Sequence, residues 1–158
     1  MLRKLINPYV GQDGYNCIGC SPGNPIGLHL EFWEDGDEIV TEWSPSANYQ
    51  GWVNTLHGGI ISTLVDEIAG WVVTRKLQTA GMTTSLNVKF LKPVYTTEPK
   101  ITLRASIANH RRNFVVIHVT LINSRGEVCD EGDATYYAFD HERAKEMKFM
   151  ACKVEGEE

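Results

Sequence analysis

The segment His57-Gly58-Gly59, followed by Asp66 nine residues after the histidine, combines residue types that suit acyl-transfer chemistry. If a helix begins at these glycines, its first backbone N–H groups have no partner within the helix and carry the positive end of the helix dipole. Glycines place no side chain in the way, so a carbonyl oxygen can approach these donors closely, as in an oxyanion hole. Asp66 is then the candidate catalytic carboxylate, acting as a general base on water or as a nucleophile.

An amphipathic helix is predicted around these residues. From about residue 58 to residue 75, apolar side chains recur every four residues, at Ile60, Leu64, Ile68 and Val72. This period is typical of a largely buried helix. Asp66 would lie roughly 13 Å along the axis from the histidine, too far to act on a carbonyl held at the start of its own helix. Either these residues do not form one site, or two chains share it, one that provides Gly58 and another that provides Asp66.

Strands are predicted on both sides of this helix. Two are expected before it, at about 28–33 and 39–43, and four after it, one ending before Pro93 and others at about 101–107, 114–122 and 128–139. Residues 114–122 are apolar on both faces, which indicates a central strand. The order β-β-α-β-β-β-β predicts one α+β domain, an antiparallel meander curled around the helix. Residues 1–27 form an irregular lead-in, and the polar tail from about 141 receives no function.

The stretch from Gly51 to Glu67 resembles the signature of hotdog-fold acyl-CoA thioesterases, most closely the phenylacetic-acid-degradation-type branch. The segments Phe90-Leu91-Lys92-Pro93-Val94, Cys17-Ile18-Gly19-Cys20 and Asn24-Pro25-Ile26-Gly27-Leu28 resemble further blocks of that family. The resemblance covers about residues 15–140. It implies a hotdog fold, in which a curved antiparallel sheet wraps one long central helix, hydrolysis of an acyl-CoA thioester, and active sites at a dimer interface.

The same resemblance implies roles for individual residues. Gly58 would polarise the thioester carbonyl, with Gly59 as the fallback, and Asp66 would come from the partner subunit. His57 would orient the loop that leads into the helix rather than transfer a proton. Thr83 would hold the water or the carboxylate, although it also fits an ordinary strand threonine. Glu67 is the second-choice catalyst or else an exposed or structural carboxylate.

The candidate substrate-binding residues flank this motif or lie on a later turn. Arg111 and Arg112 sit at an expected strand-to-strand turn and could bind CoA phosphates through charge-assisted hydrogen bonds. A solvated basic turn is the alternative. Trp52 could line an acyl or aryl pocket, or belong to the core or an interface. Asn54 and Thr84 are the other two candidate substrate-binding residues.

Cys17 and Cys20 form a C-x-x-C motif. One such pair cannot close a tetrahedral zinc site without two more ligands, and the sequence offers no second pair at convincing spacing, His29 being a loose possibility. A thioredoxin-like context is also absent. We therefore expect structural thiols, no metal, and no cofactor other than the coenzyme A of the substrate.

Composition narrows the partners. A formal net charge of −5 over 158 residues argues against nucleic acid or an anionic membrane as the main partner. The first residues turn polar too soon for a signal-peptide core, and no apolar run approaches membrane-spanning length. We expect a cytoplasmic homodimer or homotetramer that binds an acyl-CoA small molecule.

Three functions stay open at this point. Hydrolysis of a medium-chain or aryl acyl-CoA leads. A non-catalytic acyl-CoA-binding hotdog domain is the first alternative, although the chain has no output module. A hotdog dehydratase or hydratase is the second, and its histidine–carboxylate motif is not found.

Overall fold

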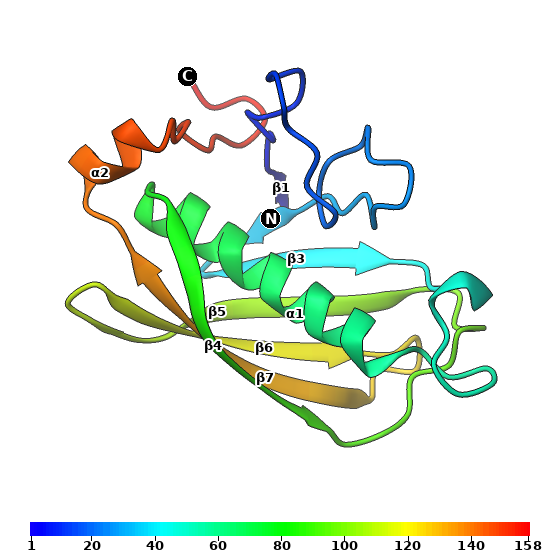
Figure 1. Ribbon diagram of the computed structural model, residues 1–158. Helices are drawn as coiled ribbons and strands as arrows, with labels where there is room; N and C mark the ends of the chain where they lie inside the picture. Colours follow the sequence, from blue (N-terminus) through cyan, green and yellow to red (C-terminus); the bar gives the residue numbers. More distant parts are fainter.

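The computed structural model describes residues 1–158 as one seven-stranded antiparallel sheet with a long helix across one face (Figure 1). The strands are β1 (Arg3–Lys4), β2 (Trp33–Asp35), β3 (Glu38–Trp43), β4 (Gly81–Phe90), β5 (Ile101–Arg111), β6 (Phe114–Ile122) and β7 (Val128–Ala138). The helices are α1 (Gly58–Val72) and α2 (His141–Glu146), with a 3-10 turn at Ala47–Tyr49 and a π-helical turn at Val73–Leu77. The predicted α+β class and the curved sheet around one central helix are confirmed.

The helix α1 is buried along the predicted stripe. Leu64, Ile68 and Val72 have no exposed surface, whereas Ile60 at the start of the helix is only half-buried. The predicted end near residue 75 falls inside the π-helical turn, which stops at Gln78 in a left-handed conformation with φ 51°. These apolar side chains fill the concave side of the sheet, and their burial is the main favourable contribution to folding.

The sheet order is β1-β2-β3-β5-β6-β7-β4, so the predicted simple meander is wrong in one respect. The strand that follows the helix, β4, does not lie beside β3. It pairs with β7 at the far edge, because α1 carries the chain across the whole sheet. The predicted central strand is confirmed, since β6 lies between β5 and β7.

The first predicted strand is displaced along the sequence. Leu28, Leu30 and Phe32 alternate and are all buried, but only Trp33–Asp35 forms a strand. The backbone N–H groups of Leu28 and Leu30 donate to the carbonyls of Ile18 and Gly19 instead. The alternation therefore reported burial correctly, while the backbone pairs with the N-terminal loop rather than with the sheet.

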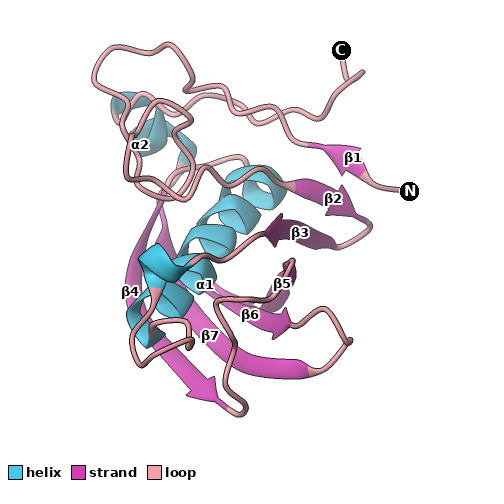
Figure 2. Cartoon of the chain, turned by 90° about the vertical axis from the view of Figure 1, so that its right-hand side faces the viewer, coloured by secondary structure: helices cyan, strands magenta, loops and turns pink.

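Both ends of the chain lie together at the C-terminal end of α1 (Figures 1 and 2). Leu5 pairs with Val154 in an isolated antiparallel bridge. Glu34, 5% exposed, accepts from Arg75 and Lys76 and pairs with Arg3, so strands β1 and β2 are tied to the helix end. The terminal segments are held by these ion pairs and by Leu5, Cys152 and Val154, which are buried in the hydrophobic core.

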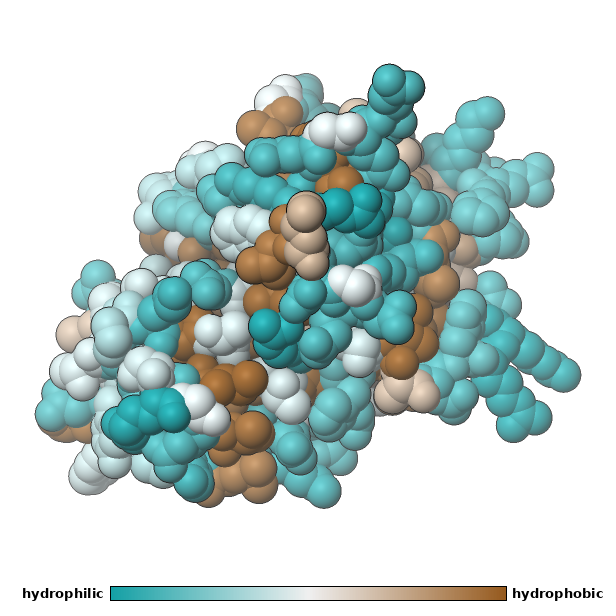
Figure 3. Space-filling view, turned by 180° about the vertical axis from the view of Figure 1, so that it is seen from behind, coloured by the Kyte–Doolittle hydropathy of each residue, from teal (hydrophilic) through white to brown (hydrophobic).

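The surface is largely hydrophilic when seen from behind, with apolar side chains in small separate patches (Figure 3). None of the helices combines the length and the apolar character that crossing a bilayer requires.

Candidate active site

The start of α1 is organised by His57. Its ring Nδ1 accepts the backbone N–H of Gly59 at 2.8 Å, so the exposed imidazole caps the helix. A Cβ atom on residue 59 would lie 2.9 Å from that nitrogen, so this cap requires glycine. His57 thus orients the start of the helix, and the backbone N–H of Gly59 is already used in this hydrogen bond.

Gly58 contributes the free donor at this helix start. Its N–H has no acceptor in the chain, and the positive end of the helix dipole lies there. A cavity of about 210 Å³ adjoins it, lined by Gly58, Phe90 and Asp130 among others. The geometry is that of a site for a carbonyl oxygen, with Gly58 as the available amide.

Asp66 lies in the middle of α1 and is held by two strands. Thr83 of β4 donates from Oγ1 to Oδ1 of Asp66 at 2.7 Å. The Tyr136 hydroxyl of β7 lies 2.6 Å from the same oxygen and 2.7 Å from the main-chain oxygen of Asp66, and it can donate its single proton to one of them at a time. Oδ2 has no hydrogen-bond partner in the chain. The carboxylate is therefore fixed through one oxygen and free at the other.

Tyr136 was missed in the sequence. Burial, followed by its hydrogen bond to Asp66, raises the pKa of its hydroxyl, so it stays a proton donor near neutral pH. A signal was present: Tyr136 alternates with Ala134 and Ala138 on the buried face of the last strand. A buried tyrosine usually finds a partner for its hydroxyl.

Gly58 and Asp66 lie eight residues apart on the same straight helix, roughly 12 Å along its axis. One carbonyl cannot meet both within one chain. The two halves of the candidate site are intact but separated.

The remaining substrate-binding candidates lie outside this network. Trp52 is 83% exposed, and Asn54 adopts a left-handed conformation with φ 63° in the same loop. Thr84 donates to the carbonyl of Thr135 at 3.0 Å, which is a contact within the sheet edge. None of the three forms a hydrogen bond with Asp66.

Arg111 and Arg112 lie at the turn between β5 and β6, and both are exposed. Arg112 has φ 56°, and neither side chain forms a hydrogen bond within the chain. This turn is at the opposite end of the sheet from the start of α1 (Figure 1). Both guanidinium groups are thus available to an outside ligand.

Glu67 is half-buried and turned away from the Asp66 network. Its Oε1 accepts from Trp71 Nε1 at 3.2 Å and contacts Cys17 Sγ at 3.4 Å. Burial raises the pKa of this carboxyl to about 7. Together with Cys20 these groups form a cluster that could hold a metal ion.

An open cavity of about 520 Å³ adjoins both the Asp66 network and the cluster around Glu67. It is lined by Thr83 and Tyr136, which hold Asp66, and by Cys17, Cys20 and Glu67. A ligand in this cavity would contact both.

Asp130 is a second group that the sequence did not indicate. It is 1% exposed, and neither carboxylate oxygen has a hydrogen-bond partner. Burial raises the pKa of Asp130 to about 7. The sequence of strand β7 did not indicate this burial, because an aspartate that follows the apolar Cys129 is expected to face outwards in an alternating strand.

Residues 53–130 match the family model of the thioesterase superfamily. A Thermoplasma acidophilum protein described as a candidate esterase is 27% identical over 85 residues, which are 53% of this chain and 63% of that protein. The match thus spans less than two thirds of the relative's own length.

Solved structures share the fold. A thioesterase from Streptococcus pneumoniae, described as hypothetical and solved with coenzyme A, is 22% identical with a TM-score of 0.63 over 69% of this chain and 87% of that one. The Escherichia coli PaaI protein from the phenylacetic acid degradation operon is 15% identical with a TM-score of 0.63 over 72% of this chain and 81% of that one.

Proposed function

We propose that this chain, whose residues 53–130 match the family model of the thioesterase superfamily, hydrolyses acyl-CoA thioesters to a free acid and coenzyme A. The observation that carries the proposal is the half-buried Asp66, whose Oδ1 is held by Thr83 and Tyr136 while Oδ2 stays free. A neighbour of the same fold was solved with coenzyme A, which supports this class of thioester. A medium-chain or aryl acyl group is the proposed acid portion.

The chemistry needs few groups. In the general-base route, Asp66 takes a proton from water as the water oxygen bonds to the thioester carbonyl carbon. The Gly58 N–H of another copy stabilises the oxygen that becomes negative. When the carbonyl re-forms, the C–S bond breaks and coenzyme A leaves as a thiolate, which is a good leaving group because thiol pKa values lie near about 8.5.

The proposal requires a homodimer or a dimer of dimers, because Gly58 and Asp66 of one chain are too far apart. The exposed edge of the sheet supports a second copy as the occupant. Strand β4 has no neighbour on its outer side, and Met82 and Phe90 are 58% and 55% exposed there. An uncovered edge strand with apolar side chains is a ready surface for pairing with another chain.

Replacement of the carboxylate tests the proposed function. Asp66→Asn should lower kcat for acyl-CoA hydrolysis by at least about 100-fold, because a positioned base contributes that much, while leaving the oligomer size and coenzyme A affinity nearly unchanged. Thiol release from a panel of acyl-CoAs measures turnover, and calorimetry measures binding. Asp37→Asn, in the exposed β2–β3 turn, is the matched control.

Undiminished turnover in the Asp66 variant would contradict the assigned role. Binding of acyl-CoA without turnover by the wild-type protein would support a non-catalytic binding domain instead. Hydrolysis in water labelled with oxygen-18 tests for the nucleophilic route: label in the Asp66 carboxylate identifies a mixed anhydride that water opens at the aspartyl carbon. An unlabelled Asp66 with labelled product acid excludes that path and shows that water attacks the acyl carbon, either directly or in the anhydride.

A further inference from the structure

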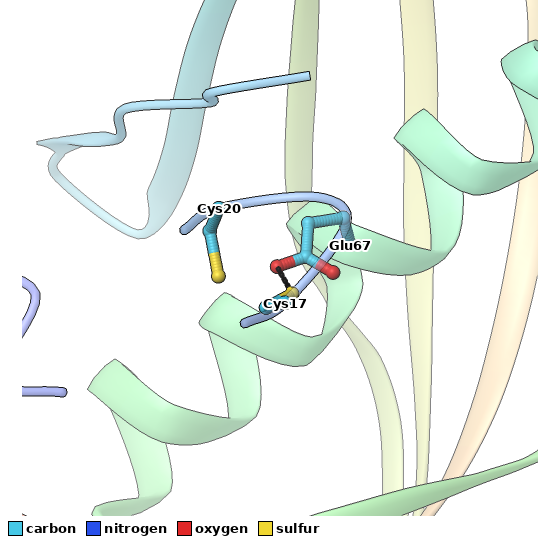
Figure 4. Close-up of side chains that lie close together, drawn as sticks. All are labelled: Cys17, Cys20 and Glu67. Atoms are coloured by element: carbon cyan, nitrogen blue, oxygen red, sulfur yellow. Dashed lines mark hydrogen bonds between the residues drawn. The ribbon is translucent and has the colours of Figure 1, made fainter. Parts of the chain in front are cut away.

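A cluster of sulfur and carboxylate groups lies where the N-terminal loop crosses α1 (Figure 4). The Sγ atoms of Cys17 and Cys20 and a carboxylate oxygen of Glu67 all lie within 4.8 Å of one another. Cys17 and Glu67 are 50 residues apart in the sequence. The fold therefore supplies a third ligand to a pair that could not form a site by itself.

The spacing of these atoms fits a tetrahedral zinc ion. With zinc–sulfur and zinc–oxygen bonds of about 2.3 Å and about 2.0 Å, neighbouring sulfur and oxygen ligands lie about 3.5 Å apart. Cys17 Sγ is 3.4 Å from Oε1 of Glu67. Only small side-chain adjustments are then needed to bring the three donors onto one ion.

The carboxylate of Glu67 lacks a cationic partner. It forms no ion pair, and its hydrogen-bond partners are the Cys17 thiol and the Trp71 indole N–H. Buried charges in proteins are usually paired or coordinate a metal. Gly19 allows the close approach, since a Cβ atom there would lie 2.4 Å from Cδ of Glu67.

Both sulfurs have hydrogen-bond partners that fix their positions. The backbone N–H of Gly19 donates to Sγ of Cys17 at 3.3 Å. The Tyr15 hydroxyl lies 2.8 Å from Cys20 Sγ. Zinc binds thiolates, and hydrogen-bonded partners of this kind orient ligands and increase metal affinity.

We propose that Cys17, Cys20 and Glu67 bind a zinc ion whose fourth coordination position faces the 520 Å³ cavity. Two thiolates favour zinc over magnesium or calcium, which prefer oxygen ligands. A water molecule from that open cavity, which Thr83 and Tyr136 also line, can occupy the open position. The ion would fasten the N-terminal loop to the central helix.

Metal binding can be measured without any enzymatic activity. The full-length protein, reduced and treated with a chelator under nitrogen, is titrated with cobalt and then with zinc in competition with a chromophoric chelator. We expect one equivalent, a thiolate-to-cobalt charge-transfer band and the intense visible bands of four-coordination. Cys17→Ser, Cys20→Ser and Glu67→Gln should each weaken zinc binding by at least about 100-fold. Cys129→Ser should bind as the wild type does.

A second readout does not depend on the variants' folding. In the wild-type protein, zinc should protect Cys17 and Cys20 from alkylation, as measured by mass spectrometry, while Cys152 keeps its own rate. Absence of the charge-transfer band would overturn the proposal. Unchanged zinc affinity in Glu67→Gln would also overturn it, as would a Cys17–Cys20 disulfide that resists treatment with a reducing agent.

Discussion

Asp130 gives the most direct test of the energetics in this fold. The variant Asp130→Asn removes a carboxyl that is 1% exposed and has no hydrogen-bond partner. Burial raises its pKa in the folded protein from 3.8 to about 7. The protonated form is therefore favoured in the folded state, so this group's stabilising contribution is complete below about pH 4 and is lost as the pH rises to about 7.

The size of the effect follows from these two pKa values. At about 1.4 kcal/mol for each tenfold change in a protonation equilibrium, ionised Asp130 lowers the free energy of unfolding by up to about 4 kcal/mol above neutral pH. Asp130→Asn should thus be more stable than the wild type at about pH 8, and this advantage should shrink steadily towards about pH 4.

Urea unfolding of the wild type and of Asp130→Asn from about pH 4 to about pH 8 measures the difference in their free energies of unfolding. The contributions of the other titrating groups cancel in this difference. Glu131→Gln, on the neighbouring residue of β7, is the control and should show no such trend. A difference between Asp130→Asn and the wild type that is independent of pH would refute the reasoning. It would mean that a partner, such as a second copy of the chain, neutralises this carboxylate.

Three further predictions concern other parts of the chain. Thr83→Val should lower kcat/KM by roughly 10-fold to 100-fold, because hydrogen bonds to charged groups contribute about 1.5–3 kcal/mol, and Thr83→Ser should restore it. Arg75 and the other cations lower the pKa of Glu34 to about 2, so this carboxylate stabilises the fold by about 3 kcal/mol above pH 4.5, and the stabilisation is lost as the pH falls towards about 2. Glu34→Gln should remove this contribution, which acid unfolding curves measure. Arg111→Ala and Arg112→Ala should each raise KM for acyl-CoA by about 10-fold but leave KM for small thioesters unchanged, and equal effects on both substrates would remove the phosphate-binding role.

The local sequence predicted most of the fold because period and burial agree along the chain. The four-residue repeat of α1 and the alternation of apolar side chains from Ile101 to Ala105 in β5 each report which side chains face the core, and both elements begin where they were expected. The prediction of a strand at Leu28–Trp33 was wrong because alternation shows which side chains are buried but not whether the backbone pairs with a sheet or with a loop. The predicted meander order was wrong at β4 for a similar reason, since the path of the chain across the sheet decides which strands pair.

The site was predictable only where its residues are close in sequence. His57, Gly58 and Asp66 share one segment, so the spacing indicated both the helix start and the need for a second chain. Tyr136 reaches Asp66 from 70 residues away, and no local pattern announces that contact. The cluster around Glu67 depends likewise on a loop folding back over the helix.

The pairing of Leu5 with Val154 makes the first and last segments depend on each other. Backbone hydrogen bonds run in both directions between them, from Ile6 to Lys153 and from Glu155 to Lys4. A protease that removes the tail would also remove these partners from the first segment, which would keep its pairing with β2. A tag or carrier fused to either end, in contrast, would project from the side of the molecule where both termini lie (Figure 1).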